Sequence, residues 1–246
     1  MTDLITHDTA AFSYLPGSSA FSVGALAAPG WAVDELRLAR PLPLAVGLGR
    51  VVDVLADRGL GAHAIVGLEL RSPEAVDVEG FATFNAGYQD LLAARGLIGG
   101  GANPVTRTNA VPDGGSLHER SIVAAQVVRP DPGGSGGDWV LSGVAELLAD
   151  GTAVAAGDLS DAGMAAKAAH VLDVVAERLA ALGAGTANVV NVYCPQDLGP
   201  LYDQVAARVP AVEGASLRHW RCVPPLLGLA FEVDCRRISR WEWVDA

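Results

Sequence analysis

The stretch that decides the fold lies near the middle of the chain and reads Pro130-Asp131-Pro132-Gly133-Gly134-Ser135-Gly136-Gly137. Proline favours extended backbone, and glycine and serine offer little side chain to pack, so this composition is typical of a linker. It separates two halves of comparable size, and 246 residues are enough for two small domains. We therefore predict an N-terminal domain over residues 1–130, a linker over 131–137 and a C-terminal domain over 138–246.

Outward from the linker, the first half shows two stretches with apolar residues at helical spacing. These are Pro43–Arg58 and Phe81–Ala94, and a glycine that favours helix termination follows each of them. Apolar runs predict the strands of this half at Ala20–Leu26, Ala64–Leu70, Val105–Val111 and Ser121–Val128.

The second half begins with a predicted hairpin around Asp150-Gly151, a pair that favours tight turns, with strands at 139–148 and 153–156. Ser160 or Asp161 can cap a long helix over residues 162–182, which Gly183 ends. The remaining expected elements are a strand at Val189–Tyr193, a helix at Leu198–Val209 and strands at Leu217–Val223 and Leu229–Cys235.

The two halves share one order of elements: strand or hairpin, helix, strand, helix, strand, strand. This repetition predicts a duplicated α+β unit, in which a mixed sheet is covered on one face by two helices.

Composition and charge exclude several classes of partner. The formal net charge is −11, which repels nucleic acid and anionic membranes. No apolar run is long enough for a membrane helix, and the N-terminus lacks the pattern of a signal peptide. We expect a cytoplasmic protein that binds neither nucleic acid nor membrane.

The cysteines and histidines suggest neither a disulfide framework nor a metal site. Cys194, Cys222 and Cys235 match no zinc-binding spacing, and the histidines form no HxxxH or HExxH pair. We predict no metal site and no cofactor.

Several segments resemble the RidA family, most clearly in the second half. They include Leu141-Ser142-Gly143, Ala169–Asp173, Val189–Tyr193 and Pro225–Asp234, with weaker matches at Phe84–Tyr88 and Pro104–Arg107. The two halves in this order resemble the chorismatases, which embed RidA-like modules in a longer chain. Matching pieces are Tyr14–Gly17, Gly80–Gly87, Val123–Pro130, Leu141–Ala145 and Gly157-Asp158.

The resemblance implies two tandem RidA-like modules of the chorismate mutase-like fold. One departure is that the Pro- and Arg-rich central segment of chorismatases is reduced here to the glycine linker. The resemblance therefore carries over to the fold better than to the reaction.

Glu232 is the candidate catalytic residue. In chorismatases the glutamate of the closing strand is the acid that protonates the substrate, and Glu232 stands at that position. Strand alternation also places Glu232 and Asp234 on one face, opposite Phe231 and Val233. If a neighbour seals that face, loss of solvent raises the pKa of Glu232 towards working pH; otherwise it is a solvated carboxylate on an open sheet.

Arg107, Arg218 and Arg221 are candidates to bind a substrate carboxylate through forked hydrogen bonds. Arg107 falls where RidA proteins carry the arginine that binds substrate. Tyr193, at the end of a predicted strand, is a further candidate for substrate binding. The alternatives are surface salt bridges for the arginines and a half-buried core position for the tyrosine.

Three functions follow from these observations. The first is a chorismatase-like enzyme that cleaves or rearranges chorismate, or a related carboxylated enol ether of secondary metabolism, by acid assistance. The second is a RidA-type enamine or imine deaminase, and the third is a non-catalytic scaffold that binds a small molecule. RidA modules assemble in threes, so the resemblance implies a homo-oligomer, with a trimer favoured, although pairing of the two sheets within one chain would leave a monomer.

Overall fold

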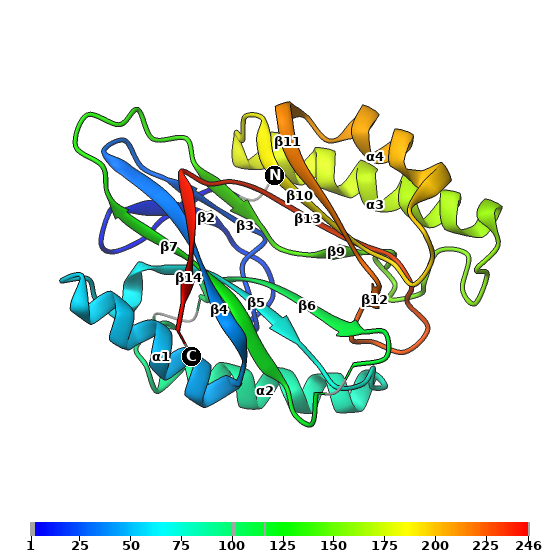
Figure 1. The fold of residues 1–246 in the computed structure, drawn as a ribbon, viewed down its shortest axis with the longest axis horizontal. Coiled ribbons are helices and arrows are strands. Elements are labelled where there is room, and N and C mark those ends of the chain that lie inside the picture. Colours follow the sequence, from blue (N-terminus) through cyan, green and yellow to red (C-terminus); the bar gives the residue numbers. More distant parts are fainter. Residues whose placement is uncertain (1–2, 100–101, 116, 246) are drawn as a thin grey trace.

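The computed structural model describes residues 3–99, 102–115 and 117–245, and within them the chain forms two mixed β-sheets (Figure 1). The β13 sheet has the strand order β1-β2-β3-β8-β13-β10-β11, with β9 paired to β13, and the β5 sheet has the order β12-β6-β5-β7-β4-β14. Each sheet contains parallel and antiparallel pairs. The fold is therefore α+β with mixed sheets, as the sequence predicts.

The strands of the β13 sheet are β1 (Ile5–Thr6), β2 (Phe12–Leu15), β3 (Gly24–Ala27), β8 (Trp139–Leu141), β9 (Val144–Ala145), β10 (Ala187–Tyr193), β11 (Ala211–Trp220) and β13 (Glu232–Arg237). Those of the β5 sheet are β4 (Trp31–Pro43), β5 (Ile65–Arg71), β6 (Thr106–Pro112), β7 (Ser121–Pro130), β12 (Cys222–Val223) and β14 (Arg240–Val244). The helices are α1 (Leu44–Asp57), α2 (Val78–Ala93), α3 (Asp161–Leu182) and α4 (Tyr202–Arg208), with short 3-10 turns at Ala62–Ala64 and Gly199–Leu201.

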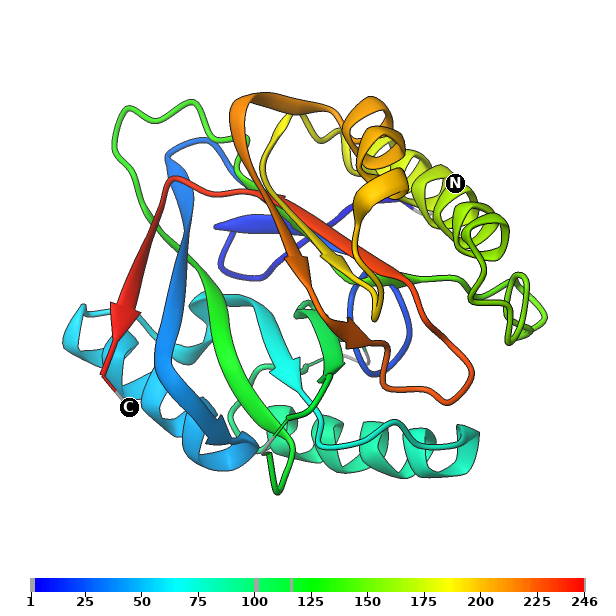
Figure 2. The same cartoon turned by 45° about the vertical axis from the view of Figure 1, so that its right-hand side comes forward.

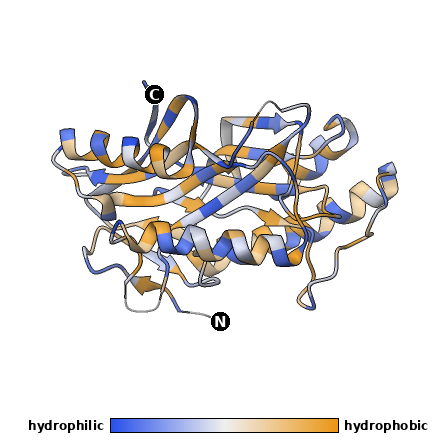
Figure 3. Ribbon diagram, turned by 90° about the horizontal axis from the view of Figure 1, so that it is seen from below, coloured by the Kyte–Doolittle hydropathy of each residue, from blue (hydrophilic) through white to orange (hydrophobic). Residues whose placement is uncertain are grey.

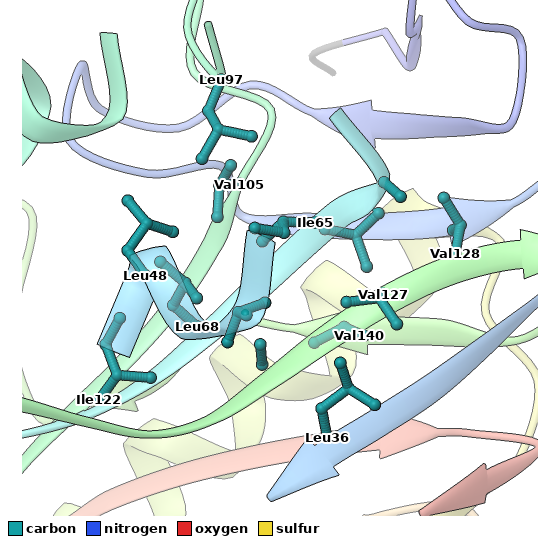
Figure 4. Close-up of a cluster of buried hydrophobic side chains, with 14 of the residues drawn as sticks. Leu36, Leu48, Ile65, Leu68, Leu97, Val105, Ile122, Val127, Val128 and Val140 are labelled. Atoms are coloured by element: carbon teal, nitrogen blue, oxygen red, sulfur yellow. The ribbon is translucent and has the colours of Figure 1, made fainter. Parts of the chain in front are cut away.

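Two helices cover the outer face of each sheet, so the inner faces of the sheets are turned towards each other (Figure 1). Helices α3 and α4 share a hydrophobic core with the β13 sheet, in which Val171 and Val175 pack with Val190 and Val233. Helices α1 and α2 share another core with the β5 sheet. Figure 4 shows part of it, with Leu48, Ile65, Leu68, Ile122 and Val127 gathered in one cluster.

Hydropathy follows this layering. Figure 3 shows many hydrophobic residues along the strands in the middle of the molecule, whereas the helices alternate between hydrophobic and hydrophilic residues. Among the described helices, none combines the length and the apolar character needed to cross a lipid bilayer.

Each sheet takes strands from both sides of the glycine-rich segment. Strands β2 and β3 extend the β13 sheet through β8, and β14 lies parallel to β4 at the edge of the β5 sheet (Figure 2). The two sheets therefore do not correspond one to one with residues 1–130 and 138–246. The division of the chain at residues 131–137 stays a prediction about its organisation.

Helix boundaries agree closely with the sequence pattern for α1, α2 and α3. The Ser160 hydroxyl accepts a hydrogen bond from the backbone N–H of Gly163 at 3.2 Å, which confirms the predicted cap of α3. Gly183 ends the helix with φ +67°, a left-handed conformation that favours glycine.

The predicted hairpin is wrong. Residues 153–156 form no strand and only an isolated bridge joins Leu147 to Ala153, while the preceding strand breaks at Ser142-Gly143 into β8 and β9. The long strand β4 was not predicted, because its Asp34, Glu35 and Arg37 resemble a solvated loop. In the structure both carboxylates are fully buried and paired with arginines.

Candidate active site

A charged network joins the inner faces of the two sheets. Arg236 on β13 lies at its centre and forms salt bridges with Glu35 of β4 at 2.5 Å, with Asp234 at 2.6 Å and with Glu69 of β5 at 3.5 Å. Arg71 pairs with Glu69 at 2.7 Å. Burial alone would raise the pKa of Glu69, but the arginines around it, led by Arg71, lower it to about 2.

These contacts show what covers the sheet faces that the helices leave bare. Each face is covered by the other sheet of the same chain, and the charges between them are compensated. The sequence left two possibilities for this cover, a second chain or the other half of the same chain, and the described residues show the latter.

Glu232 begins β13 and points to the inner side of its sheet. Phe231 and Val233 pack in the core beneath α3, which confirms the alternation predicted from the sequence. Burial raises the pKa of Glu232 to about 8, and the neighbouring Asp234 carboxylate adds to this effect, against the opposing influence of Arg71. Glu232 is therefore largely protonated at neutral pH.

Arg107 on β6 is also buried. Its Nη1 donates a hydrogen bond to Oδ1 of Asn85 at 2.9 Å, and no salt bridge to Arg107 occurs among the described residues. Burial lowers the pKa of Arg107 to about 10, so the guanidinium stays charged at neutral pH. Four aromatic rings surround the guanidinium, and its Cζ lies 4.6 Å from the ring centroid of Phe21, 5.0 Å from that of Tyr88, 5.2 Å from that of Phe84 and 5.6 Å from that of Phe81.

Glu232 and Arg107 meet in a cavity of about 200 Å³. Its walls also include Asn109, Arg178 and several apolar residues: Phe21, Phe81, Val144, Leu147, Val174, Pro224, Pro225, Leu226 and Leu229. A small, largely apolar cavity with a few converging polar groups is typical of a site for a small organic ligand. Its buried guanidinium without a carboxylate partner favours an anionic one.

The residues between β8 and β9, Ser142 and Gly143, form hydrogen bonds to the other sheet at this cavity. Ser142 Oγ accepts a hydrogen bond from the backbone N–H of Arg107 at 2.9 Å and donates one to the carbonyl oxygen of Ser22 at 2.6 Å. The backbone N–H of Gly143 donates to the carbonyl oxygen of Arg107 at 3.1 Å. Both hydrogen bonds of the Ser142 hydroxyl thus hold the bend in the strand.

Gly143 leaves the space that the Glu232 carboxyl occupies. A Cβ atom at this position would lie 1.8 Å from Glu232 Oε1 and 2.8 Å from its Cδ, so the carboxyl group would have to move. We expect Gly143→Ala to lower the free energy of unfolding by about 1–3 kcal/mol, the usual cost of overpacking a buried site. Urea unfolding followed by circular dichroism measures this.

Gly87→Ala is the matched control for that measurement. Gly87 lies on the exposed side of α2, and a Cβ there would meet nothing within 4 Å. Because alanine favours helices over glycine, the same substitution should raise stability by up to about 1 kcal/mol. If both variants shifted stability in the same direction, the close contact between Gly143 and Glu232 would be contradicted.

A buried ion pair fixes the chain just before Glu232. The Glu146 carboxylate accepts hydrogen bonds from the backbone N–H groups of Ala230 at 2.5 Å and of Phe231 at 3.0 Å. Lys167 lies 3.4 Å from Glu146, and both side chains are fully buried. Sequence reasoning did not include these residues, although Lys167 is the only lysine in the chain.

The other residues predicted from the sequence lie outside this cavity. Arg218 contacts the inter-sheet network, 3.6 Å from Glu35, and Arg221 pairs with the exposed Asp197. Tyr193 is fully buried and donates a hydrogen bond to Asp234 at 2.8 Å. The structure thus brings Glu232 and Arg107 together but places Arg218, Arg221 and Tyr193 elsewhere.

Two further residues at the site were missed: Asn85, which accepts a hydrogen bond from Arg107, and Arg178, which lines the cavity. Asn85 lies in one of the segments that carry the family resemblance, and its amide was the available signal. Arg178 gave no such signal, because a single arginine on a long helix is typical of a solvent-exposed position. In the described part of the chain, no three histidine, cysteine or acidic side chains are grouped so that they could hold a metal ion.

Comparison with known proteins gives three findings. A family model described as 2-aminomuconate deaminase CnbZ matches residues 4–242. A 2-amino-5-chloromuconate deaminase of Comamonas testosteroni is 30% identical over 250 residues, which cover 98% of each protein. A crystal structure of a chorismatase covers 96% of this chain and 89% of its own, with a TM-score of 0.52 and 14% identity, which confirms the chorismatase-like fold and no more.

Proposed function

Because the chain belongs to the CnbZ family of 2-aminomuconate deaminases, we propose that it hydrolyses a 2-aminomuconate-type substrate to a 2-oxo acid and ammonia. One observation carries this proposal: Glu232, with a pKa raised to about 8, lines the same small cavity as Arg107, whose guanidinium has no salt-bridge partner among the described residues. That pair offers one proton and one site for a carboxylate, side by side.

The proposed reaction needs both. A 2-aminomuconate is an enamine, with its amino group on a double-bonded carbon next to a carboxylate. Protonation of a carbon in the conjugated chain, other than the one that bears nitrogen, converts the enamine to an iminium ion. Water then adds to the carbon that bears nitrogen. Collapse of this adduct breaks the carbon–nitrogen bond and releases ammonia. One water is consumed and no electrons are exchanged, so the change is a hydrolysis.

We assign the roles from the geometry of the cavity. Arg107 binds the carboxylate next to the amino carbon, because forked hydrogen bonds to a carboxylate suit a guanidinium that no acidic side chain occupies. Glu232 donates the proton to carbon. The resulting carboxylate then accepts a proton from the attacking water, so that one group serves as acid and base in turn.

The Glu146–Lys167 pair positions this acid. Glu146 accepts hydrogen bonds from the backbone N–H groups of Ala230 and Phe231, and in this way it fixes the direction in which the Glu232 side chain points. We propose a positioning role for Glu146, since it acts through the backbone rather than on the substrate.

Cleavage of chorismate, which the sequence resemblance implied, has weaker support. The chorismatase likeness rests on 14% identity and concerns the fold, whereas the deaminase family matches almost the whole chain. The alternative enamine or imine deaminase is therefore favoured. A derivation of the two sheets from tandem RidA-like modules stays part of the proposal.

The assembly into a trimer also stays a proposal. Since the two inner sheet faces already cover each other within one chain, the cavity at Glu232 gains its walls without a second subunit. Light scattering on the purified protein measures the assembly directly.

The direct test uses 2-aminomuconate generated in the assay, with ammonia release measured against the spontaneous rate. We expect the protein to accelerate ammonia release and to release no pyruvate from chorismate. Pyruvate from chorismate, with no acceleration of deamination, would overturn the proposal.

A further inference from the structure

A second arginine lines the cavity from the opposite layer of the molecule. Arg178 projects from α3, one helical turn after Val174, which lines the same cavity. Arg178 is partly buried, and burial lowers the pKa of its guanidinium. The exposed carboxylate of Glu177 opposes this effect and does not cancel it. In the described part of the chain, Arg178 forms no salt bridge and no hydrogen bond.

Most arginines of this chain form a salt bridge within the described residues, whereas Arg178 does not. The protein carries 28 acidic residues against 17 basic ones, so carboxylates are abundant. Salt bridges within the described residues engage Arg37, Arg58, Arg71, Arg129, Arg208, Arg218, Arg221, Arg236, Arg237 and Arg240. Two of the guanidiniums left without a salt bridge, Arg107 and Arg178, line one cavity, and this arrangement suits a ligand with two negative charges.

The two arginines approach the cavity from different sides. Arg107 comes from β6 in the β5 sheet, and Arg178 comes from the helix layer outside the β13 sheet. Arg178 and Val174 also line an adjoining hollow of about 700 Å³, so Arg178 lies at the boundary between that hollow and the cavity. The remaining wall of the cavity is mainly apolar, with Phe21, Leu147, Pro225 and Leu226.

We infer that Arg178 binds the second carboxylate of the substrate, the one remote from the amino carbon, and makes the site selective for short unsaturated dicarboxylates. The amino end then lies at Arg107 and Glu232, the hydrocarbon middle lies against the apolar wall, and the far carboxylate lies at the boundary with the hollow. Arg178 is thereby a specificity-determining residue, remote from the reacting carbon. This inference rests on the proposed function for the orientation of the substrate.

A pair of unreactive ligands isolates the second carboxylate. Sorbate and trans,trans-muconate have the same six-carbon diene and the same first carboxylate, and they differ only in a methyl group against a second carboxylate. Titration calorimetry on the wild type should show muconate binding at least about 10-fold more tightly than sorbate, as expected for a charge-assisted contact. In Arg178→Met the ratio of the two dissociation constants should fall close to one, mainly through weaker binding of muconate.

Arg208→Met is the matched control, since Arg208 lies on the neighbouring α4, is exposed and pairs with Asp173. It should keep the wild-type ratio. If Arg178→Met does not fold, Arg178→Gln replaces it, with the same expected loss of preference. A wild type that binds both ligands equally, or an Arg178 variant that keeps the wild-type ratio, overturns the inference.

Kinetics separate this inference from the proposed function. With 2-aminomuconate, Arg178→Met should raise KM about 10- to 100-fold and change kcat much less. If the wild type releases ammonia but Arg178→Met leaves KM unchanged, the inference alone fails. If the wild type releases none, the proposed function fails, and the binding ratio still decides whether Arg178 contacts the far carboxylate.

Discussion

Replacing Glu232 by glutamine is expected to lower kcat for ammonia release by about 10²- to 10⁴-fold, the usual contribution of a general acid–base group. Glutamine has the shape of a protonated glutamate but transfers no proton. Because Glu232 is mainly neutral at pH 7, the variant should fold normally and bind substrate with a similar KM. Discontinuous assays of ammonia release measure the effect. The control is Glu79→Gln, because Glu79 is exposed in the first turn of α2. An active Glu232→Gln enzyme would contradict the proposed role.

The raised pKa of Glu232 also predicts two effects of pH. The acid form is needed for the first proton transfer, so kcat/KM of the wild type should fall as pH rises through about 8. In addition, the folded state holds the proton more tightly than the unfolded state, in which the pKa is near 4.5. The wild type therefore loses stability as pH rises from about 4.5 to about 8, and the glutamine variant lacks this loss. Above pH 8 Glu232→Gln should be the more stable protein in urea unfolding.

Replacing Arg236 by methionine is expected to lower the free energy of unfolding by about 3–5 kcal/mol, the typical cost of removing one partner from a buried ion pair. The arginine is almost fully buried, and it holds Glu35 and Asp234 at 2.5 and 2.6 Å. Without it these carboxylates remain buried between the sheets with less compensation. Urea unfolding at pH 7 measures the difference.

Arg237→Met is the control for this substitution. Arg237 follows directly in the chain but is partly exposed, and its contacts are weak: a 3.9 Å ion pair with Asp138 and hydrogen bonds to Thr186 at 3.3 and 3.5 Å. Its loss should change stability by less than about 1 kcal/mol. Equal effects of the two variants would show that the charged network does not hold the sheets together.

Periodicity predicted most of the fold because the elements concerned are amphipathic or uniformly apolar. Helix α3 has apolar residues on one side, Ser160 before it and Gly183 after it, and its bounds were predicted almost completely. Strand β4 escaped prediction because its acids are buried by distant partners: Glu35 pairs with Arg236, far along the chain. No local pattern reveals such a partner.

The candidate site divides in the same way. Glu232 could be predicted because strand alternation and a family resemblance both single it out, and Arg107 because it stands in a recognisable segment. Arg178 and Glu146 could not, since their importance depends on the packing of α3 and of the loop before β13 against the cavity. Arg218 and Arg221 were also candidates from the sequence, but tertiary pairing directs them to Glu35 and Asp197.

The proposed mechanism depends on a carboxyl group that packing between the two sheets keeps protonated beside a guanidinium. The most direct test is a pH titration of the Glu232 carboxyl carbon by NMR on protein labelled at glutamate with ¹³C, assigned with the Glu232→Gln variant. We predict a transition near pH 8. A transition near pH 4.5, the usual value for glutamate, would contradict the proposed role of Glu232.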